Sequence, residues 1–265
     1  SVQGEDGFID GLDEPFRTQA QAWLQRHAES VNLYVAPNAT LAHRMAGLLA
    51  VPPGRVRIVP TGVEADRFPP ATGRPRDPFV VGYLSAITPL KGLDLLAEAY
   101  LRFRRDWPGT AQLHVAGTVL APAFWNGVQA VLAREGRAAE LRYAGEPDAA
   151  GKRSFLQGLS VFVQPSRIPE ARGLAALEAL AAGVPVLAPA AGAFPEMLEA
   201  TGGGRCVPPA DPAALAQALV ALATDPETAD AMGKCAAAGL RTHHAPEAAA
   251  QAFLRLCDEI RIPAG

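Results

Sequence analysis

Cysteine, lysine and long apolar runs are all scarce in this sequence. Its 265 residues include three cysteines, Cys206, Cys235 and Cys257, an odd number without paired spacing. This argues against a disulfide framework or a zinc site and indicates reduced, buried thiols. No apolar run reaches the roughly 18 residues of a membrane span, and the N-terminal residues lack a signal-peptide pattern. We therefore expect a cytoplasmic protein.

Positive charge is limited as well. The formal net charge is −3 at pH 7, which argues against non-specific binding to nucleic acid or to an anionic membrane, because both need a basic excess. Most cations are arginines, and Lys91, Lys152 and Lys234 are the only lysines. A lysine at a particular place in such a chain is therefore of interest.

Two common nucleotide-binding fingerprints are missing. Neither Gly-x-Gly-x-x-Gly after a first strand nor Gly-x-x-x-x-Gly-Lys-Ser/Thr occurs, which counts against nicotinamide dehydrogenases and P-loop nucleotidases. The run Gly202-Gly203-Gly204 follows a predicted helix rather than a strand. We interpret it as a plain turn.

The chain does contain a regular alternation of short apolar segments and helical patterns. With 49% hydrophobic and 19% charged residues it is globular, and from residue 78 onward the alternation predicts an α/β fold. The expected form is a Rossmann-like, doubly wound parallel sheet covered on both faces. Predicted strands cover residues 32–36, 56–59, 79–83, 112–116, 140–144, 161–164 and 186–188. Predicted helices cover residues 15–28, 40–49, 91–107, 123–135, 149–158, 173–183, 194–199, 211–224, 226–240 and 246–260.

Capping residues and a linker mark the limits of the units. Asn38, Asp211 and Asp225 are suited to cap helix N-termini, the latter two just before a proline. Residues 69–78 are rich in Pro, Arg and Gly, which is typical of a boundary between two units. We predict one unit over residues 1–68, a larger one over residues 69–245, and a closing helical segment over residues 246–265.

The most informative stretch is residues 165–185, PSRIPEARGLAALEALAAGVP. It follows a predicted strand, and ligands of open parallel sheets bind beyond the carboxyl ends of the strands. Gly173 opens a helix there, and the free N–H groups of Gly173 and Leu174 form an anion site that a phosphate can approach closely.

Two glutamates flank this helix start. Glu170 and Glu178 would lie roughly 12 Å apart along one continuous helix, too far for the carboxylate pair of a glycoside hydrolase. With Glu170 in the loop and Glu178 in the second turn, they can contact different parts of one elongated ligand, such as sugar and ribose hydroxyls. Taken alone, such glutamates are more often solvated charges.

Lys91 is the third candidate, because it stands where a strand-to-helix loop enters its helix. An ammonium at the positive end of a helix dipole is unfavourable unless an anion lies between them. A phosphate would supply that anion. The alternative is a solvated surface lysine.

Together these residues resemble the signature of retaining family-4 glycosyltransferases of the GT-B fold. Glu170, seven residues and Glu178 lie within EARGLAALEALAAGVPV. The segments VRIVPTGVEADRF, LKGLDLL, LHVAG, LRYAGE, VFVQPS and AGAFPEMLEATGGG follow in the family's order and spacing over most of the chain. The resemblance implies the C-terminal half of a GT-B architecture with a helical tail. Residues 1–68 would be the remnant of an N-terminal acceptor domain with its linker, residues 69–245 the donor-binding domain, and residues 246–265 the crossing helix.

The resemblance also implies a reaction. A hexose-type unit would pass from a UDP- or GDP-linked sugar to an unidentified sugar, lipid or small-molecule acceptor, with retention by front-face attack and without a metal or other cofactor. Lys91 and Glu170 would be catalytic. The implied donor contacts are diphosphate for Lys91, the sugar for Glu170, phosphate for the N–H groups of Gly173 and Leu174, ribose for Glu178, and the base for Gly145 and Glu146.

Two departures from the family pattern bear on activity. Ala86 stands where the family has an arginine that pairs with the lysine on the diphosphate, so Arg167 or Arg172 would have to substitute. About a hundred or more residues of the N-terminal half are missing, so we expect this chain alone to bind donor without turnover. The resemblance leaves open peripheral membrane association through that half. A degenerate, non-catalytic nucleotide-binding module and a GT-B nucleotide-sugar epimerase are the alternatives.

Overall fold

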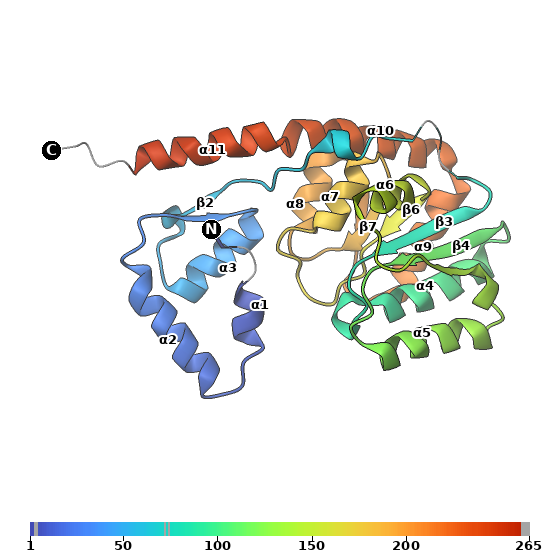
Figure 1. Ribbon diagram of the computed structural model, residues 1–265, viewed down its shortest axis with the longest axis horizontal. Coiled ribbons are helices and arrows are strands. Elements are labelled where there is room, and N and C mark those ends of the chain that lie inside the picture. The colour runs from blue at the N-terminus through green and yellow to red at the C-terminus, as the bar shows by residue number, and fades with distance from the viewer. Residues whose placement is uncertain (3–4, 72, 74, 261–265) are drawn as a thin grey trace.

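A computed structural model describes residues 1–2, 5–71, 73 and 75–260 (Figure 1). Its centre is a six-stranded parallel sheet in the order β5-β4-β3-β6-β7-β8. The strands are β3 (Phe79–Leu84), β4 (Ala111–Ala116), β5 (Leu141–Tyr143), β6 (Val161–Val163), β7 (Val186–Pro189) and β8 (Gly204–Val207). The chain order reverses between β3 and β6, which is the place where doubly wound sheets bind ligands. The predicted Rossmann-like, doubly wound sheet is confirmed.

Helices cover both faces of this sheet, which is why its central strands are almost wholly apolar. Every residue of β3, β6 and β7 is buried. Alternate side chains of β3 enter different cores, Val81 and Tyr83 on one face and Val80 and Leu84 on the other. The first core holds α4 (Leu93–Asp106), α5 (Pro122–Arg134) and α9 (Pro212–Thr224). The second holds α6 (Ala149–Gln157), α7 (Leu174–Ala181), α8 (Phe194–Thr201) and α10 (Pro226–His243).

The N-terminal part has a small sheet and core of its own. Strands β1 (Tyr34–Ala36) and β2 (Val56–Ile58) pair in parallel beside α1 (Glu5–Asp10), α2 (Phe16–Ala28) and α3 (Ala39–Leu49). Helix α11 (Pro246–Glu259) continues the line of α10 and runs back over this part (Figure 1). Short 3-10 turns lie at Pro53–Arg55, Ala65–Arg67, Pro89–Lys91 and Ala138–Glu140. The predicted limits of the units stay predictions.

The predicted caps are present. The Asn38 side chain accepts a hydrogen bond from the backbone N–H of Leu41, Asp211 caps α9, and Asp225 caps α10. Within the described residues, no helix is both long and apolar enough to span a membrane.

The glycine run at 202–204 is a turn only in its first two residues, which connect α8 to β8, so the prediction is wrong for Gly204. Gly202 ends α8 with φ of 61°, and Gly204 begins β8, which pairs with β7. A Cβ on Gly204 would collide with the Val186 carbonyl oxygen, so only glycine lets the two strands approach. The sequence GRCV hid the strand because it lacks the apolar run that marked the others.

The prediction for the cysteines also needs correction. Cys206, Cys235 and Cys257 are free thiols, as expected, but Cys235 is exposed and the other two are only partly buried.

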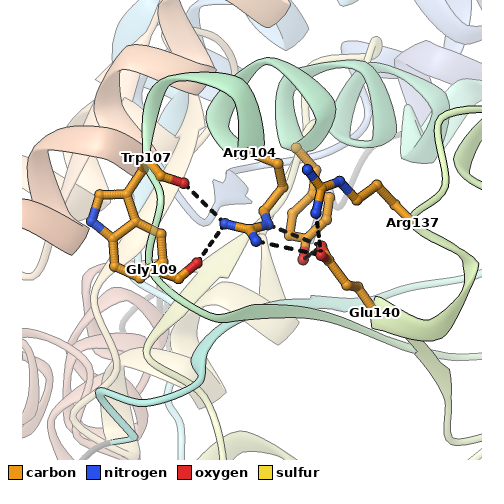
Figure 2. Close-up of polar contacts among 6 residues, drawn as sticks. Arg104, Trp107, Gly109, Arg137 and Glu140 are labelled. Atoms are coloured by element: carbon orange, nitrogen blue, oxygen red, sulfur yellow. Dashed lines mark hydrogen bonds and ion pairs between the residues drawn. The ribbon is translucent and has the colours of Figure 1, made fainter.

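A polar cluster fastens the edge strand β5 to α4 (Figure 2). Glu140 accepts hydrogen bonds from the Tyr100 hydroxyl at 2.7 Å, from Arg104 Nε at 3.0 Å and from Arg137 Nη1 at 2.8 Å. Arg104 also donates to the carbonyl oxygens of Trp107 and Gly109. Burial raises the pKa of the Glu140 carboxyl, but these donors outweigh it and hold the pKa below its ordinary value.

Candidate functional site

A cleft opens at the carboxyl ends of β3 and β6, where the strand order reverses. Its volume of about 390 Å³ is within the usual size range of small-molecule sites. It is lined by Leu84, Ser85, Lys91, Lys152, Gln164, Glu170, Ala171, Arg172, Gly173, Leu174, Ala175 and Glu178. We call it the central cleft.

Lys91 and Glu170 meet in the central cleft although 79 residues separate them. The Lys91 Nζ to Glu170 Oε1 distance is 2.6 Å, and the side chains are 24% and 15% exposed. Lys91 ends a 3-10 turn, and α4 begins only at Leu93, so the helix starts later than predicted. In this structure the Glu170 carboxylate is the anion beside Lys91, which is not a solvated surface lysine.

Close packing of two loops brings this pair together. Gly92 has φ of 71°, and a Cβ there would collide with the Pro165 carbonyl oxygen. The loop after β3 therefore rests directly on the loop after β6. On the other side of Glu170, its carbonyl oxygen accepts a hydrogen bond from Ala193 N–H at 2.8 Å. Gly192, at φ of 62°, permits that approach, since its Cβ would lie 2.5 Å from the same oxygen.

Glu178 lies in the second turn of α7, as predicted, and has a partner that sequence reasoning missed. Lys152 of α6 places its Nζ 2.9 Å and 3.1 Å from the two carboxylate oxygens. The scarcity of lysine was the available signal: two of the three lysines, Lys91 and Lys152, line the central cleft.

Gln164 is a second residue that sequence reasoning missed. Its Nε2 lies 3.4 Å from Glu170 Oε1, which is a weak hydrogen bond. Its Oε1 is buried and has no hydrogen-bond partner among the residues that the structure describes. Such an unsatisfied acceptor in a cleft wall is available to a ligand donor. The signal was one polar residue ending the apolar strand VFVQ.

The N-terminus of α7 borders the same space. Gly173 is its N-cap residue, with φ of 61°, and a Cβ there would lie 2.9 Å from Phe194 Cε1. Within the described part of the chain, the N–H groups of Gly173 and Leu174 have no hydrogen-bond acceptor. They remain donors for an anion at the positive end of the helix.

The two arginines of the loop differ in their partners. Arg167 forms two hydrogen bonds with the Asp94 carboxylate, at 2.7 Å and 2.6 Å, and one with the Pro89 carbonyl oxygen. Arg172 lines the central cleft, and its guanidinium has no partner among the described residues. With Lys91 and Lys152 each paired to a glutamate, Arg172 is the cleft cation that no other described residue pairs, so it can meet an added anion.

The structure thus brings five of the predicted site residues to one cleft: Lys91, Glu170, Gly173, Leu174 and Glu178. Gly145 and Glu146 do not line it. They follow the edge strand β5, where the Gly145 carbonyl oxygen accepts a hydrogen bond from Gly117 N–H at 2.7 Å. Their assignment to a base stays a prediction.

Comparisons with known proteins agree with this architecture. D-inositol 3-phosphate glycosyltransferase of Streptomyces avermitilis is 34% identical over 198 residues, which are 69% of this chain and 42% of that protein. Phosphatidyl-myo-inositol mannosyltransferase of Mycobacterium leprae is 32% identical over 168 residues, covering 62% and 43% of the two chains. The chain spans about half the length of the curated relatives it matches.

Solved structures show the same fold. Anabaena Alr3699/HepE, crystallised in complex with UDP and glucose, aligns with a TM-score of 0.81 at 16% identity, covering 92% of this chain and 67% of that one. Sucrose-phosphate synthase from Thermosynechococcus elongatus aligns with a TM-score of 0.79 at 22% identity, covering 98% and 64%. The chain therefore has the fold seen in GT-B glycosyltransferase structures, with a helical C-terminal tail.

A family model adds the decisive match. The model described as glycosyl transferases group 1 covers residues 64–238, from the end of the N-terminal part to α10. This segment includes every residue that lines the central cleft. The chain belongs to the group 1 family of glycosyl transferases.

Proposed function

We propose that this chain is the donor-binding part of a retaining family-4 glycosyltransferase. It takes a UDP- or GDP-linked hexose as donor, needs no metal or other cofactor, and acts in the cytoplasm. The observation that carries the proposal is the central cleft itself. A lysine, a helix N-terminus and two glutamates converge there at the reversal point of the sheet, and together they match the charges and hydroxyls of a nucleotide-diphosphate sugar.

Each residue has a role in this proposal. Lys91 contacts the donor diphosphate, and the N–H groups of Gly173 and Leu174 hold phosphate oxygens at the positive end of α7. Arg172 supplies the second cation, because Arg167 is held by Asp94. Glu178 accepts hydrogen bonds from the ribose hydroxyls, which its four acceptor positions allow even while Lys152 is bound.

Glu170 faces the donor sugar and is the proposed catalytic partner of Lys91. When donor binds, Lys91 exchanges part of its contact with Glu170 for the diphosphate, which frees a carboxylate oxygen for sugar hydroxyls. The bond between the anomeric carbon and the phosphate oxygen breaks, and the acceptor oxygen bonds to that carbon from the same face. The acceptor proton passes to the departing phosphate oxygen, whose negative charge Lys91 and Arg172 stabilise.

Calorimetry with UDP, GDP and their sugars tests this proposal. We expect one of the two nucleotides to bind with a micromolar dissociation constant; failure of the folded protein to bind either would refute it. Glu178→Ala should weaken the ribonucleotide about tenfold or more, because hydrogen bonds to charged groups contribute about 1.5–3 kcal/mol. The same variant should weaken the 2′-deoxyribonucleotide less, because that ligand keeps only the 3′ hydroxyl to donate to Glu178. An equal loss for both nucleotides would contradict the ribose assignment.

Transfer assays with the full-length protein decide between the proposal and its alternatives. A transferase requires an acceptor and yields a glycosylated product. An epimerase converts the nucleotide sugar without an acceptor, and a degenerate module binds without turnover. No specific observation favours either alternative over transfer.

A further inference from the structure

The loop that carries Glu170 is held from two directions, and one of them is the N-terminal part of the chain. Asn38, the N-cap residue of α3, donates a hydrogen bond through Nδ2 to the Ala171 carbonyl oxygen at 2.7 Å. Its Oδ1 meanwhile accepts from Leu41 N–H at 2.8 Å. Asn38 is only 7% exposed, so its two bonds are shielded from water.

A second contact joins the same helix to α8. The Glu196 carboxylate accepts hydrogen bonds from the backbone N–H groups of Ala39 and Thr40, both at 2.8 Å, and from the Thr40 hydroxyl. A carboxylate at a helix N-terminus satisfies free donors and meets the positive end of the dipole. Burial alone raises the pKa of Glu196, but these donors hold it below its ordinary value.

Together these contacts form a closed ring that passes through the loop, α8 and α3. Helix α8 also begins beside Ala193, whose N–H binds the Glu170 carbonyl oxygen. Two consecutive carbonyl groups are therefore fixed, that of Glu170 by α8 and that of Ala171 by α3, and Glu196 ties α3 to α8. Because a trans peptide is planar, fixing the Ala171 carbonyl toward Asn38 turns the Arg172 N–H the opposite way, away from α3.

We propose that Asn38 and Glu196 are positioning residues for the donor site: through this ring, which we call the α3 clamp, the N-terminal part sets the orientation of Glu170 and of the following peptide groups. The inference rests on the proposed function in one respect: it takes a nucleoside diphosphate as the ligand whose affinity should fall when the clamp is weakened. The clamp consists of Asn38, Ala39, Thr40, Ala193 and Glu196, together with the carbonyl groups of Glu170 and Ala171 that they hold.

Asn38→Ser tests the clamp in the 265-residue chain. A serine hydroxyl still caps α3 by accepting from Leu41 N–H, but it is too short to donate to Ala171. We expect faster amide hydrogen exchange at Ala193 with unchanged protection at Leu41, and an affinity for UDP or GDP, whichever binds, that is about three- to tenfold lower. That range corresponds to the loss of about one hydrogen bond.

Two further variants make the outcome decisive. Glu196→Gln keeps the side-chain size but replaces one carboxylate acceptor, so it should loosen the same loop. Asp211→Ser alters the N-cap of α9, which is outside the clamp, and should change neither Ala193 exchange nor nucleotide affinity. If Asn38→Ser does not fold, Glu196→Gln carries the test alone.

Each result has one meaning. Wild-type exchange at Ala193 in Asn38→Ser, or faster exchange with unchanged nucleotide affinity, would overturn the positioning role. A wild-type chain that binds neither nucleoside diphosphate would refute the proposed function, while Ala193 exchange would still decide whether the clamp holds the loop.

Discussion

Arg172 and Arg167 lie five residues apart in one loop, and their different partners give opposite expectations for the same substitution. Arg172 lines the central cleft without a partner among the described residues, whereas Arg167 is bound to Asp94. Arg172→Gln should weaken UDP or GDP binding strongly. Arg167→Gln should leave it within about twofold, because its backbone N–H still binds the Leu90 carbonyl oxygen and exposed ion pairs contribute only about 0–1 kcal/mol.

The expected loss of affinity in Arg172→Gln follows from the negative charge of the phosphates that the guanidinium would contact. A hydrogen bond to a charged group contributes about 1.5–3 kcal/mol, and each 1.4 kcal/mol is about tenfold in affinity. Arg172 is half-buried, so solvent screening favours the lower part of this range. We expect a loss of about 10- to 30-fold for the diphosphate, a smaller loss for the monophosphate, and none for the nucleoside.

Calorimetry with the diphosphate, the monophosphate and the nucleoside on both variants measures these differences. Thermal melting of each variant verifies that the fold is intact. Wild-type diphosphate affinity in Arg172→Gln, or an equal loss for nucleoside and diphosphate, would show that Arg172 does not contact the phosphates. A large loss in Arg167→Gln would instead show that its contacts with Asp94 and Pro89 shape the site.

Two further predictions concern stability. Glu140→Gln should lower the free energy of unfolding by about 2–3 kcal/mol at pH 7 by leaving buried donors poorly matched. The folded-state pKa of Glu140 is lowered, so its stabilisation is present above its ordinary pKa and is lost as the pH falls through the folded value. Urea titrations should therefore show the unfolding free energies of wild type and variant converging in acid. A difference that stays constant with pH would contradict this. Gly92→Ala should destabilise the fold more than Gly136→Ala. Both glycines have φ near 70°, at 71° and 70°, but a Cβ at Gly92 would meet the Pro165 carbonyl whereas one at Gly136 has open space. The left-handed backbone alone costs about 1–2 kcal/mol, so equal melting temperatures would refute the proposed loop contact.

Local patterns were enough to predict most elements of the sheet. The buried strands β3, β6 and β7 are continuous apolar runs, which is what a sheet covered on both faces requires. Asn38, Asp211 and Asp225 marked helix starts because capping needs only groups within three residues. Strand β8 escaped prediction because its place is set by contact with β7 and not by its own sequence.

In the candidate site, too, some residues could be predicted from local sequence, whereas their contacts with distant segments could not. Glu170, Gly173 and Glu178 could be predicted from sequence because they lie within nine residues of one continuous segment, with Gly173 at the start of a helix that carries Glu178. The pairing of Lys91 with Glu170 and of Lys152 with Glu178, and the choice between Arg167 and Arg172, join segments up to 79 residues apart.

The sequence by itself determined the doubly wound fold and the helix that starts after Gly173, with Glu170 before it and Glu178 in its second turn. Short-range sterics, capping and hydrophobic periodicity all act along the chain. Only the tertiary structure decided which cation of the central cleft lacks a partner within the described part of the chain, and that α3 holds the Ala171 carbonyl from 133 residues away. Such contacts depend on how separate elements pack, and no local pattern encodes the partner of a side chain that reaches across the fold.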